Sequence, residues 1–207
     1  MLRTILPLVL LPAGLLLGWL ALGGRTERAD FVLTCPEPRT LDPQRVSWLA
    51  EIQLAATMFE GLTRLSGETF LPEPAGASHW DVDAARLSYT FHLRSGVRWS
   101  NGEPVVTEDY RFSWLRALDP QCECQYANLL FVIRGAAEYY ASRANGDLAD
   151  DRSAQTVGIE ALDKQTLRVT LANPCSYFLE LTSFITFVPV HRATLEKWAY
   201  RDGRVLR

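Results

Sequence analysis

The segment from Leu87 to Pro120 constrains the fold most strongly, because its apolar pattern changes from strand to helix periodicity across one turn. Every second residue is apolar from Leu87 to Leu93, which is typical of a strand with one buried face. Asn101-Gly102 favours a turn, since both residues tolerate positive φ. Apolar residues then recur at helical spacing after Thr107, a candidate N-cap, until Asp119-Pro120 ends the pattern. The segment therefore predicts a strand, a turn and a helix.

Further strands and helices are predicted on both sides of this segment, and short turns join many of the strands. The composition, with 48% apolar and 11% aromatic residues in 207, is sufficient for a well-filled core. The mixture favours an α+β fold. The predicted helices are 49–59, 126–133, 136–144, 177–181 and 193–198, and the other predicted strands are 31–33, 62–65, 157–159 and 166–171.

The charge pattern and the motif content argue against several classes of function. A net charge of −3, with dispersed basic residues, provides no basic surface for nucleic acid. The three histidines are far apart in the sequence, and no nucleophile elbow, phosphate-binding loop or dinucleotide fingerprint is present. Asp147, Asp150 and Asp151 lack the ligand order of a calcium loop. We therefore expect that the protein is not an enzyme and that it binds no cofactor and no metal ion. Asp81 and Asp83 are interpreted as solvated loop acids.

Four cysteines, Cys35, Cys122, Cys124 and Cys175, leave the redox state open. They allow three pairings as two disulfides, and the sequence does not choose among them. Cys122-Glu123-Cys124 lacks the spacing of a zinc knuckle, and no matching Cys/His pair accompanies it. We expect one disulfide or buried thiols.

Residues 4–24 carry no charge and follow Arg3, as in a basic region followed by an apolar export signal. The run is also close to the length that spans a bilayer, so residues 1–28 are predicted to be a signal peptide or a membrane anchor. Lipidation is not expected, because Cys35 follows charged residues rather than the apolar stretch. The exported part is then placed in the periplasm or on the outer face of the cytoplasmic membrane.

Short motifs along the exported region resemble the family 5 extracellular solute-binding proteins of ABC importers, the oligopeptide- and dipeptide-binding type. The resemblance comes from the order and spacing of the motifs together. They are TLDP at 40–43, MFEGL at 58–62, YTFHLR at 89–94, VRWSNGEPV at 97–105, SW at 113–114, ALDP at 117–120, VGIEALD at 157–163, TLRVTL at 166–171 and YFL at 177–179.

The resemblance implies the N-terminal portion of a two-lobed, type II periplasmic-binding-protein-like fold, with mixed sheets and flanking helices. Residues 29–48 correspond to the first strand and loop of the main ligand-binding lobe, and residues 49–190 to an auxiliary α+β domain. Residues 191–207 correspond to a truncated return towards the main lobe. Such proteins are more than twice as long, so we expect the opposite lobe to be absent from these 207 residues.

The resemblance also implies where a ligand is held. The backbone-contacting segment corresponds to Ser47, Trp48 and Leu49, and a ligand-contacting tyrosine corresponds to Tyr126. Relatives that bind a peptide amino end often carry an acid at the position of Ser47, so the neutral hydroxyl here implies either a loss of recognition of a charged amino terminus or a shift in the preferred ligand. Tyr126 and Trp48 have a second interpretation, in which their rings pack in the core or on the following helix.

The implied function is non-covalent binding of peptides or other small solutes for delivery to a membrane permease of an ABC importer. A separately encoded C-terminal half is a possible partner. The alternatives are a truncated or split-gene fragment that acts as a non-transporting interaction lobe, and a membrane-anchored peptide sensor. Family membership alone does not identify the solute.

Overall fold

The strand, turn and helix predicted between Leu87 and Pro120 are present in the structure, a computed structural model that describes Thr34, residues 36–145 and residues 151–199. Strand β4 runs from Ser88 to Leu93 and helix α3 from Thr107 to Ala117. Gly102 has a φ of 90°, and its N–H donates to the Trp99 carbonyl at 2.9 Å. The predicted turn is therefore confirmed. The predicted signal or anchor and the predicted strand at 31–33 lie outside the described residues.

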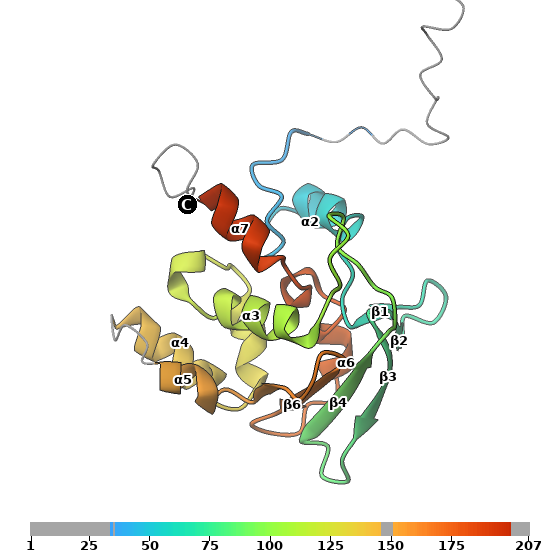
Figure 1. The fold of residues 1–207 in the computed structure, drawn as a ribbon, viewed down its shortest axis with the longest axis vertical. Coiled ribbons are helices and arrows are strands. Elements are labelled where there is room, and N and C mark those ends of the chain that lie inside the picture. Colours follow the sequence, from blue (N-terminus) through green and yellow to red (C-terminus); the bar gives the residue numbers. More distant parts are fainter. Residues whose placement is uncertain (1–33, 35, 146–150, 200–207) are drawn as a thin grey trace, which may run out of the picture. The chain divides into compact units, whose positions relative to one another are not determined.

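The other elements within the described residues follow in chain order. They are α2 (Leu49–Ala56), β1 (Thr63–Leu65), β2 (Pro72–Pro74), β3 (Ala77–Val82), η1 (Pro120–Cys122), η2 (Ala127–Val132), α4 (Ala136–Ala144), α5 (Asp151–Thr156), β5 (Ile159–Ala161), β6 (Thr166–Thr170), α6 (Phe178–Leu181), η3 (Ile185–Phe187) and α7 (Arg192–Ala199). In Figure 1, α2 and α7 lie at the top, and the turn between β3 and β4 lies at the bottom.

The strands form two antiparallel sheets. Strands β1 and β2 make a two-stranded sheet, and the larger sheet has the order β3-β4-β6-β5. Tyr89, Phe91 and Leu93 are buried on one face of β4, as the alternating pattern predicts. Phe91 stands opposite Leu167 of β6, so apolar residues of the central strands face the same side of the sheet. This face is covered by helices.

The main core lies between the larger sheet and α3. Trp114 is fully buried, packs edge-on against Phe187 and donates its indole N–H to the Phe187 carbonyl at 2.7 Å. A second, smaller cluster joins the segment before α2 and the last turn of α2 to the region of η3. It contains Val46, Ala55, Ile185 and Val188. The segment that precedes α2 is therefore packed against residues almost 140 positions later in the chain.

Two expectations about helices differ from the structure. The helix predicted at 126–133 is the 3-10 helix η2, because the following Ile133 is extended and forms a β-bridge with Leu171. Thr107 does not cap α3: its hydroxyl donates to the Asp163 carbonyl, and the Asp109 carboxylate accepts the Val106 N–H at 2.9 Å.

The interpretation of Asp81 as a loop acid is wrong. Asp81 lies in β3 and forms a 3.0 Å contact with His92 Nε2 across the strand pair. Asp83 does lie in the turn, where its carboxylate accepts the N–H groups of Leu87 and Ser88. Both acids therefore have structural partners in the β3–β4 hairpin.

Candidate functional site

The predicted backbone segment, Ser47 to Leu49, forms the entry to helix α2. Trp48 is the N-cap, with extended dihedral angles of −91° and 142°, and its carbonyl accepts the Ile52 N–H at 2.9 Å. The side chains of Trp48 and Leu49 are 62% and 71% exposed. Large apolar side chains with this exposure at a fixed helix start are available for contact with a ligand.

Glu51 and Arg39 hold this helix entry in place. Glu51 is buried, and its carboxylate accepts the Arg39 backbone N–H at 3.0 Å, the Arg39 Nε–H at 3.2 Å and the Ser47 N–H at 3.5 Å. Burial acts to raise the pKa of Glu51, but the hydrogen bonds from Arg39, Ser47 and Trp48 outweigh it and lower the pKa. The Arg39 guanidinium also lies 4.2 Å from the centre of the Trp48 ring.

Tyr126 meets the same segment from a distant part of the chain. Its hydroxyl donates to the Ser47 carbonyl at 3.3 Å, and its ring packs edge-on against Phe184 with centroids 5.2 Å apart. The two interpretations of Tyr126 are thus compatible, because the ring is packed and the hydroxyl reaches the candidate segment. Trp48 does not pack into the core; it lies exposed beneath the Arg39 guanidinium. The structure brings Ser47 and Tyr126 together, and their ligand-binding role stays a prediction.

The loop before this segment is attached to α3 by polar contacts that the sequence did not indicate. Arg116 donates to both carboxylate oxygens of Asp42, at 3.1 and 2.5 Å, and to Gln44 Oε1 at 2.5 Å. Gln44 is fully buried and donates its side-chain amide to the Ser113 carbonyl. Asp42 belongs to the TLDP motif, so this motif has a structural role in fixing the path to Ser47.

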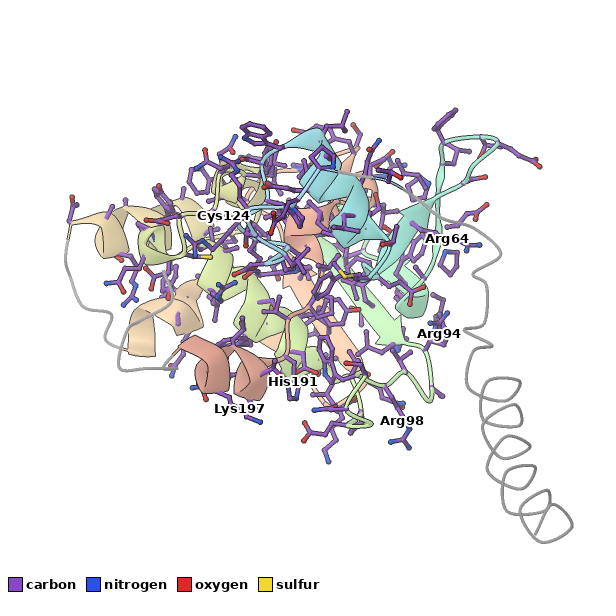
Figure 2. All side chains as sticks on the ribbon, turned by 90° about the horizontal axis from the view of Figure 1, so that it is seen from above. Arg64, Arg94, Arg98, Cys124, His191 and Lys197 are labelled. Carbon is purple, nitrogen blue, oxygen red and sulfur yellow. The ribbon has the colours of Figure 1, made fainter. Side chains whose placement is uncertain are left out.

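An apolar groove runs beside α2, with a volume of about 540 Å³. Ile52 and Ala56 of the helix form one wall, and Phe184, which supports Tyr126, forms part of another. The remaining lining residues are Phe59, Glu60, Gly61, Thr63, Arg64, Leu65, Ser183, Ile185 and Val188. In Figure 2, Arg64 of this lining and Cys124 are labelled on opposite sides of the view.

The arrangement suits non-covalent recognition. It offers exposed apolar side chains, a cation over an indole ring and a tyrosine hydroxyl, which can still accept a hydrogen bond. Across the residues that the structure describes, no group of three or more His, Cys, Asp or Glu side chains could hold a metal ion. No helix in the same residues is long and apolar enough to cross a bilayer.

The fold is that of a portion of a two-lobed solute-binding protein, and comparison with known proteins identifies its family. Residues 72–205 match the bacterial extracellular solute-binding proteins, family 5 Middle. The chain belongs to this family. The resemblance inferred from the motifs is confirmed, as is the expectation of an α+β portion of a two-lobed peptide-binding fold.

Three relatives illustrate the similarity. The oligopeptide-binding protein OppA of Bacillus subtilis (strain 168) is 38% identical over 161 residues, which are 78% of this chain and 28% of that protein. The probable deoxycholate-binding periplasmic protein YgiS of Escherichia coli (strain K12) is 34% identical, with 78% and 29% covered. The crystal structure of a periplasmic oligopeptide-binding protein from Borrelia burgdorferi superimposes with a TM-score of 0.71 at 33% identity, covering 80% of this chain and 32% of that one.

The chain thus spans less than a third of the length of the relatives it matches. The names of these relatives also differ in the solute that they mention: two contain the word oligopeptide, and one contains deoxycholate. Fold and family are shared across these cargoes, so the identity of the ligand depends on side chains at the site.

Proposed function

We propose that this chain supplies one wall of a binding site for peptides, in the solute-binding component of an ABC import system. The observation that carries the proposal is the contact between Tyr126 and the Ser47 carbonyl beneath the exposed Trp48 and Leu49. An extended peptide has its own N–H and C=O groups along both edges, together with side chains that apolar surface can accept. The exposed side chains of Trp48 and Leu49 offer such an apolar surface, and the Ser47 carbonyl can accept a second hydrogen bond beside that from Tyr126.

Two of the three relatives described above have oligopeptide in their names, and on this ground we favour a peptide over another solute. Oligopeptide appears in the names of the Bacillus subtilis protein, at 38% identity, and of the Borrelia burgdorferi structure, whose title also contains ABC transporter. The neutral Ser47 hydroxyl has no charge to pair with a free amino terminus. The preferred ligand is therefore a peptide whose amino end is held by groups elsewhere in the site.

In this proposal, the opposite wall of the binding site comes from a part of the family's fold that these 207 residues do not contain. That part is carried on the same polypeptide or on a separately encoded half. Binding is non-covalent, with no catalysis, and a permease in the membrane receives the solute. The working location is the periplasm or the outer face of the cytoplasmic membrane, in agreement with the periplasmic relatives. One wall alone is expected to bind weakly, with a Kd on the order of 1 mM, or about −4 kcal/mol.

Amide chemical-shift mapping tests this proposal because it detects weak binding. A pool of tri- to pentapeptides is titrated into the ¹⁵N-labelled chain to several times the expected Kd, and shifts are expected at Ser47, Trp48, Leu49 and Tyr126. Tyr126→Phe removes the hydroxyl and should weaken binding several-fold. Tyr140→Phe is the matched control, because Tyr140 is similarly buried and packs on Phe131 away from the site. Peptide-induced shifts confined to other surfaces, or none, would contradict the proposal.

A further inference from the structure

Two thiols lie close to Tyr126 in a pattern that family membership does not account for. Cys122 ends the 3-10 helix η1 and is buried, and Cys124 is half-buried; both are free thiols. One residue, Glu123, separates them. Two residues of extended chain span at most roughly 7 Å, which is just beyond the Cα separation of most disulfides.

The backbone at Glu123 brings the two cysteines closer than this limit. Glu123 has a φ of 57° and a ψ of 32°, a left-handed helical conformation that shortens the distance between its neighbours. The conformation is uncommon for a residue with a side chain. It is held by the Glu123 N–H, which donates to the Pro120 carbonyl at 3.0 Å, and by Arg45, which donates to the Glu123 carboxylate at 2.6 Å. The chain is thus already curled around the residue between the thiols.

The third described cysteine is elsewhere. Cys175 is buried, and its neighbours are Tyr89 and Tyr177. Cys122 and Cys124 instead share the charged neighbours Asp42 and Arg116. Among the described cysteines, Cys122 and Cys124 are therefore the natural pair.

We propose that Cys122 and Cys124 form a reversible disulfide across Glu123, and that its formation alters the support of Tyr126. In the thiol form the Cys124 sulfur lies beside the Tyr126 N–H. A bond to Cys122 turns that sulfur toward the other side of Glu123 and away from the Tyr126 N–H. The hydroxyl of the same tyrosine is bonded to the Ser47 carbonyl, which links the thiol pair to the predicted ligand segment.

The oxidation is a thiol–disulfide exchange with a low-molecular-weight disulfide. Burial raises the pKa of both thiols, that of Cys122 to about 12, and Cys124 is the less enclosed of the two. Cys124 loses its proton and attacks one sulfur of the reagent, which releases one thiol and leaves a mixed disulfide. Cys122 then loses its proton, attacks the Cys124 sulfur and releases the second thiol. The cysteines lose two electrons and two protons, and the reagent gains both.

The pairing is tested by mass spectrometry on the full chain after incubation with oxidised glutathione and alkylation without reductant. Trypsin cleavage after Arg116 and Arg134 gives one peptide with both cysteines. Its mass is expected to fall by two hydrogens, and a further cleavage after Glu123 should leave the two pieces joined. The product should disappear in Cys122→Ser and persist in Cys175→Ser. Alkylation of both thiols, or a link from Cys124 to Cys175 or Cys35, would overturn the pairing.

The effect on Tyr126 has a separate readout, hydrogen exchange of its amide. Oxidation should accelerate exchange at Tyr126 at least several-fold, and a reducing agent should reverse the change. The double variant Cys122→Ser/Cys124→Ser, which can form neither the disulfide nor the mixed disulfide, should show no response to the oxidant. An unchanged Tyr126 amide in the oxidised chain would refute the link to the ligand segment. Neither result depends on peptide binding, so this inference and the proposed function can fail independently.

Discussion

Replacing Arg116 by methionine tests whether the polar contacts beneath the TLDP loop hold the candidate site in place. Arg116 joins Asp42 and Gln44 to helix α3 through three hydrogen bonds, at 3.1, 2.5 and 2.5 Å. Methionine keeps much of the unbranched stem and removes all three donors. Asp42 is then left as a mostly enclosed carboxylate without its counter-charge.

The expected loss in the free energy of unfolding depends on how deeply the Arg116–Asp42 ion pair is buried. Removing one partner of a fully buried ion pair costs about 3–5 kcal/mol. The Arg116 and Asp42 side chains are 23% and 16% exposed, so water screens part of the interaction and we expect about 2–4 kcal/mol. Arg111 on the same helix is a matched control. Its side chain is 26% exposed, but its partner Glu108 is 58% exposed, so Arg111→Met should cost at most about 1 kcal/mol.

Urea unfolding followed by tryptophan fluorescence measures both losses, and an unchanged slope with denaturant shows that the unfolding transition is the same. A double-mutant cycle with Asp42→Ala isolates the pair. The coupling between Arg116 and Asp42 should account for at least half of the Arg116→Met loss. Equal losses in Arg116→Met and Arg111→Met, or a coupling near zero, would refute the argument that this pair fixes the loop.

Two further predictions concern the close packing around Gly76 and the charge of Glu51. Gly76→Ala should cost several kcal/mol in urea unfolding, because a Cβ there would collide with the Tyr110 hydroxyl and lie 2.7 Å from the Gly61 carbonyl oxygen. Gly67→Ala, which meets no atom within 4 Å, should change stability by less than about 0.5 kcal/mol; equal effects would contradict this reasoning. The pKa of Glu51 is lowered from its ordinary value of 4.5, so its stabilisation is full above the unfolded-state pKa and is lost as the pH falls through the folded-state value. The stability difference between Glu51→Gln and wild type in urea titrations should therefore be largest near about pH 6 and shrink as the pH falls through the folded-state pKa of Glu51; a pH-independent difference would contradict it.

The strands and helices with a regular apolar period could be predicted from the sequence. Strand β4 has apolar residues at every second position, and α3 has them at helical spacing, so local pattern and burial agree. Strand β2 was missed because its sequence, Pro-Glu-Pro, has no apolar period, and it exists through pairing with β1. Its formation depends on its partner rather than on its own residues.

Only some residues of the candidate site could likewise be predicted from the sequence. Ser47 to Leu49 and Tyr126 were reached through the family motifs, whereas Arg39, Glu51 and the Asp42–Arg116 pair were not. Glu51 did carry a local signal, since an acid at the third helical position can accept the N–H groups of the helix entry. Arg116 carried none, because its partner Asp42 is 74 positions away in the chain and only the tertiary fold brings the two together.

The support around α2 bears on how the site would bind. Helix α2 has eight residues, too few for stability in isolation, so its position must come from its surroundings. Glu51 fixes its first turn, Ala55 packs with Ile185 and Val188, and the Tyr126 hydroxyl bonds the carbonyl just before it. The backbone of Ser47 to Leu49 therefore loses its conformational freedom during folding rather than on binding. Of this segment, only the exposed side chains of Trp48 and Leu49 are left to be ordered by a ligand, which lowers the entropic cost of association.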